Sequence, residues 1–217
     1  MQILAITDIH GRTDRFESIL SGEPSADLLV LGGDLTNFGR PDDAMSIVDR
    51  AADHSEQVVA VAGNCDSKAI DRALSEAGVS VHSEGQAIYD YGVFGVSAMP
   101  PWQGTMYEFS ENDIDAYLSA GYGMVDECDE TILVSHTPPR DSGVDLTRSG
   151  EAVGSTSVRK HVEQVEPALV LSGHVHEAAG VSDIGPSTVV NCGPAKNGSY
   201  ATVTLDPTGT DVEMKQL

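Results

Sequence analysis

The chain has 217 residues, a length that lets one domain bury a sizeable hydrophobic core without disulfides or structural metals. Its 34 acidic and 12 basic residues give a formal net charge of −22, so no duplex nucleic acid partner is expected. No apolar stretch approaches the roughly 18 residues of a membrane span, and residues 1–7 lack the basic start of a signal peptide. We therefore expect a soluble, cytoplasmic protein with no membrane partner and a single domain over residues 1–217.

The acidic excess is similar to that of proteins from halophiles that accumulate salt. At molar salt the Debye length falls to about 3 Å, which removes most of the self-repulsion of such a surface. An ordinary acidic enzyme is the alternative. The cysteines are widely spaced and form no C-x-x-C pair, which indicates a reducing compartment without a disulfide framework. They are Cys65, Cys128 and Cys192.

In the first half of the chain, short apolar runs alternate with amphipathic stretches, a pattern that predicts β-α-β units with parallel strands. Strands are expected at residues 2–7, 27–31 and 57–62. Helices are expected at residues 12–20, 41–53 and 68–77. Asp66 or Ser67 is a suitable N-cap for the third helix.

In the second half, shorter β-like runs dominate. Strands are expected at residues 86–91, 93–98, 131–134, 168–171, 188–191, 199–205 and 210–215, and helices at 111–120 and 156–165. So many strands cannot form one parallel sheet with short connections, so we expect an α/β fold with two packed sheets flanked by helices. An exposed apolar edge among the later strands would allow a homo-oligomer. Two long segments, 100–106 and 138–155, read as loops at strand ends, where sites gather.

Potential metal ligands follow the apolar runs in five short clusters. Each cluster begins where a predicted strand ends, and strand ends of open α/β sheets carry chemistry. Alone, any of them could be a turn or a cap. Together they indicate a metal site. The clusters are Asp8-Ile9-His10, Gly33-Asp34, Gly63-Asn64-Cys65-Asp66, Ser135-His136 and Gly173-His174-Val175-His176.

The order of these clusters resembles the calcineurin-like metallophosphoesterase family, whose motifs run D-x-H, G-D, G-N-H-D or a variant, H, and G-H-x-H. The resemblance spans residues 8–176 and continues through 191–194. It implies a four-layer αββα sandwich of two mixed sheets. Residues 135–139 and 154–155 look most like an archaeal and bacterial branch related to cyclic-nucleotide phosphodiesterases.

The resemblance also implies the ligands of two divalent metal ions. Oxygen and nitrogen ligands suit Mn, Fe, Zn, Ni or Co. Two such ions acidify a bridging water and hold phosphoryl oxygens for in-line attack, so we expect hydrolysis of a small phosphate ester. One metal would take Asp8, His10 and His176, the other Asn64, His136 and His174, and Asp34 would bridge them.

Asp34, Asn64, His136, Cys65 and Asp66 are the candidate catalytic residues. Many family members have His at the position of Cys65, where it protonates the leaving oxygen, and a neutral thiol is a poor substitute. We therefore favour phosphodiesters or activated esters. A phosphomonoesterase or protein phosphatase is the alternative, and a non-catalytic scaffold a further one. Asp66 either orients a ligand or a water, or is only a helix cap.

Four residues are candidates for substrate contact. Arg12, Arg140 and Arg148 could bind phosphate oxygens, with ordinary surface positions as the alternative. Trp102, the only Trp, could stack on a base or an aryl group, or could anchor its loop to the core. The histidines outside the motifs are expected at the surface. They are His54, His82 and His161.

Overall fold

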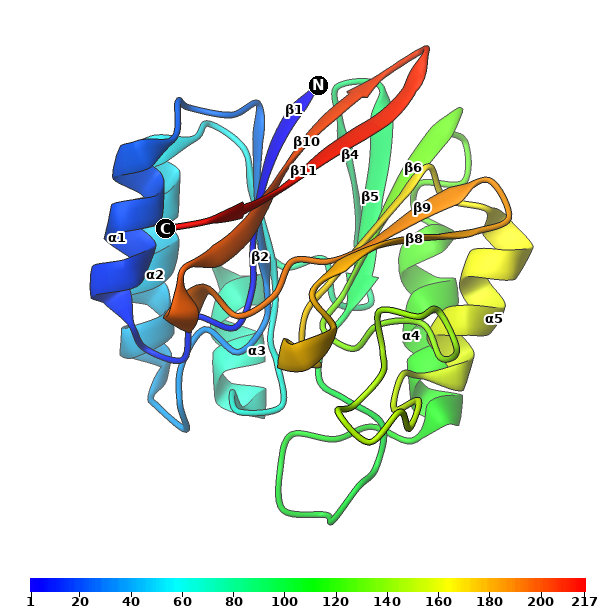
Figure 1. The fold of residues 1–217 in the computed structure, drawn as a ribbon, viewed down its shortest axis with the longest axis horizontal. Helices are drawn as coiled ribbons and strands as arrows, with labels where there is room; N and C mark the ends of the chain where they lie inside the picture. The colour runs from blue at the N-terminus through cyan, green and yellow to red at the C-terminus, as the bar shows by residue number, and fades with distance from the viewer.

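The computed structural model describes residues 1–217 and contains two β-sheets packed against each other, with helices on both outer faces (Figure 1). The first sheet has the order β11-β10-β1-β2-β3. Its strands β1, β2 and β3 are parallel, whereas β10 runs antiparallel to β1 and β11 antiparallel to β10. These strands are β1 (Gln2–Ile6), β2 (Leu28–Gly32), β3 (Val58–Val61), β10 (Ser199–Asp206) and β11 (Gly209–Gln216).

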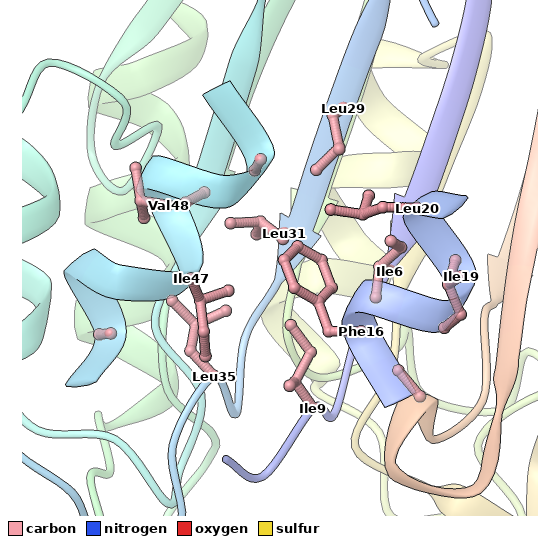
Figure 2. Packing of buried hydrophobic residues seen from close by; sticks show 14 of the residues in the cluster. Ile6, Ile9, Phe16, Ile19, Leu20, Leu29, Leu31, Leu35, Ile47 and Val48 are labelled. Atoms are coloured by element: carbon pink, nitrogen blue, oxygen red, sulfur yellow. The ribbon is translucent and has the colours of Figure 1, made fainter. Parts of the chain in front are cut away.

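Three helices cover the outer face of this sheet: α1 (Thr13–Gly22), α2 (Pro41–His54) and α3 (Lys68–Glu76). Side chains alternate along β1, so Leu4 and Ile6 pack under the helices while Ile3 and Ala5 pack against the second sheet. Figure 2 shows Phe16 of α1 in the helix-side cluster. Because the parallel strands are buried on both faces, they appear in the sequence as continuous apolar runs.

The second sheet has the order β4-β5-β6-β7-β9-β8. Its strands β5, β6, β7 and β9 are parallel, and β4 and β8 form antiparallel edges. The helices α4 (Glu111–Tyr122) and α5 (Thr156–Val165) cover its outer face (Figure 1). The strands are β4 (Gly85–Ile88), β5 (Tyr91–Val96), β6 (Glu130–Ser135), β7 (Leu169–Ser172), β8 (Gly180–Ile184) and β9 (Ser187–Asn191), with short 3₁₀ turns η1 (His176–Ala178) and η2 (Ala195–Asn197).

The predicted α/β fold with two mixed sheets between helices is confirmed, and the differences concern single elements. The strand β8 was missed. The strand expected at 86–91 ends at Ile88, because Tyr89 turns the chain with a φ of 52° and β5 then begins at Tyr91. All three cysteines are free. No helix has the length and apolar character needed to cross a membrane.

The expectation that the three motif-free histidines lie at the surface is wrong for two of them. His161 is 5% exposed, and its Nε2 lies 3.2 Å from the carbonyl oxygen of Asp115. His82 stacks on Phe109 with ring centroids 5.3 Å apart. His54 remains partly exposed. His82 and His161 therefore belong to the packing of α4, α5 and the preceding loop rather than to the solvent-facing surface.

Candidate metal centre

The predicted ligands converge at one end of the molecule, where the parallel strands of both sheets terminate. Asp8 and His10 follow β1, Asp34 follows β2, and Asn64 follows β3. From the second sheet, His136 follows β6, and His174 and His176 follow β7. Parallel strands bring their carboxyl ends to the same edge, so residues distant in sequence become neighbours here.

Asp34 lies between two histidines that come from different sheets. Its Oδ2 is 3.4 Å from Nε2 of His10, and its Oδ1 is 3.6 Å from Nε2 of His136. On the His10 side, Nε2 of His176 lies 3.3 Å from Nε2 of His10. The two oxygens of one carboxylate thus face two separate groups of nitrogen ligands.

Each of these groups has further members. Oδ1 of Asp8 lies 3.0 Å from Nε2 of His176 and 3.8 Å from Nε2 of His10. On the other side, Oδ1 of Asn64 lies 2.9 Å from Nε2 of His136. The ring of His174 lies beside that of His136, with centroids 5.2 Å apart. All seven predicted ligands are therefore gathered around one centre.

Hydrogen bonds within the protein orient these side chains. Nδ1 of His136 lies 2.9 Å from the carbonyl oxygen of Gly32, which turns Nε2 toward Asp34 and Asn64. Oδ2 of Asp8 accepts from the Thr7 hydroxyl at 2.8 Å and from the backbone N–H of His174 at 3.0 Å. Only Oδ1 of Asp8 is left to face the histidines. Thr7 was not predicted, although its position directly before the first motif was a usable signal.

The backbone around the ligands adopts conformations that L-residues rarely occupy. Asp8, His10, Asp34 and His174 have φ values of 54°, 48°, 50° and 66°. Each such residue costs of the order of 1–3 kcal/mol, and such strain gathers at functional sites. Gly63 is required because a Cβ there would lie 2.2 Å from Oδ1 of Asp34. The fold thus places the strand ends close together around these side chains.

The burial of the carboxylates indicates a cation site. Asp8 and Asp34 are 0% and 2% exposed, and neither pairs with a Lys or Arg side chain. Buried carboxylates without a fixed cation are costly unless they bind one. Asp8, His10 and His176 place ligand atoms within 4.8 Å of one another, as do Asp8, Asp34 and His136. The donors present therefore fit divalent metal ions.

Burial and neighbouring charges set the protonation of the predicted ligands. Burial would lower the pKa of His136, but the charges of Asp34 and Asp8 raise it. Burial lowers the pKa of His10 to about 4 and that of His174 to about 3, so both rings are neutral at neutral pH, the form in which imidazole binds metal ions. Burial would raise the pKa of Asp8, but the hydrogen bond from His176 and the charge of His136 hold it well below the usual range. Burial, with the negative charges of Asp8 and Asp66, raises the pKa of Asp34 to about 6 against the opposing effect of His136.

Asp66 is not the cap of α3, because the Ser67 side chain accepts the hydrogen bond from the Ile70 N–H. Instead, Asp66 accepts from the backbone N–H groups of Leu35, Thr36 and Gly63 and from the Thr36 hydroxyl, at 2.8–3.0 Å. It therefore ties the loop that carries Asp34 to the loop that carries Asn64.

Cys65 is buried beside the ligands. Its backbone N–H donates to Oδ1 of Asp34 at 2.6 Å, and its Sγ lies 3.3 Å from Nδ2 of Asn64. Burial and the negative charge of Asp34 raise the pKa of the thiol far above its ordinary value. The side chain is thus a neutral thiol at neutral pH.

The substrate candidates separate into two pairs. Arg12 forms a salt bridge with Asp14 at 2.8 Å, and Arg148 is exposed. Arg140 and Trp102 line a cavity of about 720 Å³ that also borders Asn64 and His174. Trp102 is 70% exposed, so it does not anchor its loop to the core. Met106 also lines this cavity and contacts Nδ2 of Asn64 through Sδ at 3.3 Å, a contact with no sequence signal.

Comparisons with known proteins agree with this geometry. The sequence model of the calcineurin-like phosphoesterases matches residues 1–178. An uncharacterised protein of Methanocaldococcus jannaschii is 30% identical over 210 residues, which cover 93% of this chain and 92% of that protein. A solved structure from Thermus thermophilus has a TM-score of 0.79 at 20% identity, covering 99% of this chain and 98% of the other.

The phosphopantetheinyl hydrolase of Mycobacterium tuberculosis has a TM-score of 0.64 at 15% identity, with 90% of each chain covered. At such identities the two solved structures share the fold with this chain. The family match covers most of the chain and includes every ligand cluster named above. The chain therefore belongs to the calcineurin-like phosphoesterase family, whose members hydrolyse phosphoesters with divalent metal ions.

Proposed function

We propose that residues 1–217 act as one domain that binds two divalent metal ions and hydrolyses phosphate esters, with Asp34 bridging the ions. The observation that carries this proposal is the position of Asp34, whose two oxygens lie 3.4 Å and 3.6 Å from the histidines on opposite sides. A site for one metal ion would need histidines on only one side of Asp34.

Each ion would be held by residues from different strand ends. Mn, Fe, Zn, Ni or Co suits a set of carboxylate, amide and imidazole ligands. When bound, such a pair supplies a hydroxide at neutral pH and neutralises charge on the phosphoryl group. One ion would bind Asp8, His10 and His176, and the other Asn64, His136 and His174.

The protein's own contribution is orientation. Gly32 fixes the ring of His136, and Asp66 fixes the separation of the loops that carry Asp34 and Asn64. Preorganised ligands need not reorganise as charge develops on the phosphoryl group, which lowers the barrier. These contacts act through the metal ligands and do not touch the substrate.

Cys65 supports a preference for phosphodiesters or activated esters over simple monoesters and phosphoproteins. A buried thiol with a raised pKa is a poor proton donor to a leaving oxygen. Esters whose leaving group departs without a proton suffer least from this. The free, largely buried cysteines also suit the proposed location in a reducing cytoplasm.

The test is metal reconstitution in molar salt followed by two measurements. Metal content should reach two ions per chain, and Mn²⁺, Co²⁺, Ni²⁺ or Zn²⁺ should restore hydrolysis of bis(4-nitrophenyl) phosphate. Faster hydrolysis of 4-nitrophenyl phosphate would favour the monoesterase alternative. Two bound ions without hydrolysis of any ester would favour the non-catalytic scaffold and overturn the proposal.

Cys65→His tests the role of the thiol. If the missing proton donor limits departure of the leaving group, the variant should hydrolyse a monoester with a poor alkoxide leaving group, such as glycerol 2-phosphate, faster by about 10-fold or more. The gain should be smaller on bis(4-nitrophenyl) phosphate, whose leaving group departs without a proton. Steady-state rates on the two esters give this comparison, and Cys65→Ser is the control for side-chain size. Equal gains on both esters would reject the explanation.

A further inference from the structure

The cavity beside the metal centre is partly lined by apolar side chains. It has a volume of about 720 Å³ and borders Asn64 and His174, so a substrate bound at the metals would extend into it. Met99, Pro100 and Trp102 contribute apolar surface to it. Trp102 is 70% exposed. A large aromatic side chain exposed next to a catalytic centre loses favourable burial, which a bound ligand would restore.

The loop that carries Trp102 is held in place without apolar packing at its tip. The carboxylate of Glu108 accepts hydrogen bonds from the backbone N–H groups of Trp102 at 3.2 Å and Gly104 at 3.0 Å, and a longer one from Gln103 at 3.4 Å. One acidic side chain therefore replaces a hydrophobic anchor. This loop projects from the ligand end of the molecule, between β5 and α4 (Figure 1).

The base of the same loop is attached to the metal site. The N–H of Tyr107 donates to the carbonyl oxygen of Asn64 at 3.1 Å, and its hydroxyl donates to buried Asp71 at 2.7 Å. Met99 pairs with Tyr107 and Phe109 through backbone hydrogen bonds. The position of Trp102 relative to Asn64 is thus set by a continuous series of hydrogen bonds.

The cavity also contains a cation that the protein itself does not neutralise. The Arg140 guanidinium forms no salt bridge, although the chain has 34 acidic residues. Glu111, another lining residue, is bound to the first residues of α5 through Ser155, Thr156 and Ser157. Glu151 and Glu177 also line the cavity and would repel an anion, which leaves Arg140 as the one Lys or Arg lining residue that can bind it.

We propose that this cavity binds a planar aromatic group of the substrate, an aryl ring or a nucleobase, which stacks on Trp102 while Arg140 binds an anionic oxygen of the same molecule. The phosphoester part of this inference rests on the proposed function, whereas the stacking part does not. The ligand class is therefore a phosphate ester with a flat aromatic substituent, rather than a phosphorylated sugar or lipid.

Because Trp102 is the only Trp, its fluorescence reports on the cavity directly. The full chain is titrated with AMP, phenyl phosphate and ribose 5-phosphate, with and without Zn²⁺. We expect saturable quenching by AMP, phenyl phosphate or both, and none by ribose 5-phosphate. Whichever aromatic probe binds more tightly shows whether the ring is a nucleobase, as in AMP, or an aryl group, as in phenyl phosphate. No saturable change with either aromatic probe, or equal changes with ribose 5-phosphate, would overturn the inference.

Variants add a second readout by calorimetry. Trp102→Ala should weaken binding of the better aromatic probe by about 5- to 100-fold, and Trp102→Phe should retain most of the affinity. Tyr89→Ala is the matched control, because Tyr89 is 60% exposed but lines a different cavity, and it should bind the probe as the unmodified chain does. Unchanged binding by Trp102→Ala would contradict the proposal.

The stacking inference and the proposed function can fail separately. Quenching of Trp102 without hydrolysis of any ester would reject the phosphoesterase and retain the aromatic subsite. Hydrolysis of an ester without quenching of Trp102 would retain the phosphoesterase and reject the aromatic subsite. Arg140→Gln distinguishes the two contacts within the subsite, because it should weaken AMP binding but leave adenosine binding unchanged. Equal losses for both ligands would remove Arg140 from the proposal.

Discussion

We expect Asp34 to destabilise the metal-free chain at neutral pH. Its pKa is raised to about 6, chiefly by burial, so the folded chain holds this proton more tightly than the unfolded chain. Ionisation above pH 6 therefore costs folding free energy, and that cost is absent below the unfolded pKa of about 4. Asp34→Asn should raise the Tm of the metal-free protein at pH 8 by a few degrees and abolish the Tm increase caused by Mn²⁺. Thermal melts with and without the ion test both effects, and a lowered metal-free Tm would contradict the argument.

The same carboxylate makes metal affinity depend on pH. Burial would lower the pKa of His136, but the charges of Asp34 and Asp8 raise it, so an incoming ion must displace a proton from this ring near neutral pH. Below pH 6 the ion must also displace the proton of Asp34, and near pH 4 that of His10. Metal affinity should therefore fall by at least about tenfold per pH unit below pH 6 and more steeply below pH 4. Competition with a chelating dye between pH 8 and pH 4 measures this slope. Constant affinity from pH 7 to pH 5 would show that Asp34 stays ionised without metal.

The turn after β3 is shaped to receive Asp34 from the neighbouring strand. At Gly63 an added Cβ would lie 2.2 Å from both the backbone N and Oδ1 of Asp34, so Gly63→Ala must displace the carboxylate. Metal affinity should fall by about 10- to 100-fold, the range seen when groups that orient ligands are changed. Calorimetric titration with Mn²⁺ measures this loss. Gly22→Ala, at the end of α1 with nothing within 4 Å of the added Cβ, should bind metal normally.

Elements with a strong local pattern could be predicted from the sequence. The strand β1 appears in the sequence as an apolar run followed by Asp8 and His10. The run is continuous because both faces of the strand are buried. The strand β8 has no such signal, because Gly180–Ile184 is an edge strand in which only Ile184 is buried, and it pairs only with β9. Its formation depends on a partner rather than on its own residues.

The surface expectation for His161 was wrong for a different reason, and the choice between two roles for Trp102 could not be made from the sequence. His161 has the helical spacing of a buried residue, because it lies between Val158 and Val162 on one face of α5, and this periodicity was available in the sequence. Trp102 had no comparable signal. Its exposed position depends on the hydrogen bonds to Glu108, which come from loop backbone groups whose conformation no periodicity specifies. That the seven predicted ligands lie together could be predicted because each follows a strand end.

The distribution of charge over the molecule explains why salt should matter to stability. Five acidic residues line a second cavity, distinct from the one beside the predicted metal ligands. They are Asp27, Asp90, Asp129, Glu130 and Asp206. With 12 basic side chains against 34 acidic ones, pairing cannot neutralise this surface. Most of the salt bridges that Lys and Arg side chains form are exposed, and such pairs stabilise a fold by only about 0–1 kcal/mol. The net repulsion therefore remains in the folded state.

Tm should consequently rise with KCl at neutral pH. The formal charge of −22 repels itself over about 10 Å at 0.1 M salt but over only about 3 Å at 1 M, so added salt removes repulsion that the folded state suffers more than the unfolded chain. Thermal melts between 0.1 and 2 M KCl at pH 7.5 measure the effect, and melts at pH 4.5, where carboxylates approach their ordinary pKa values of about 4, provide the control. The rise should be large at pH 7.5 and small at pH 4.5. An equal rise at both pH values would assign the effect to strengthened apolar burial rather than to charge.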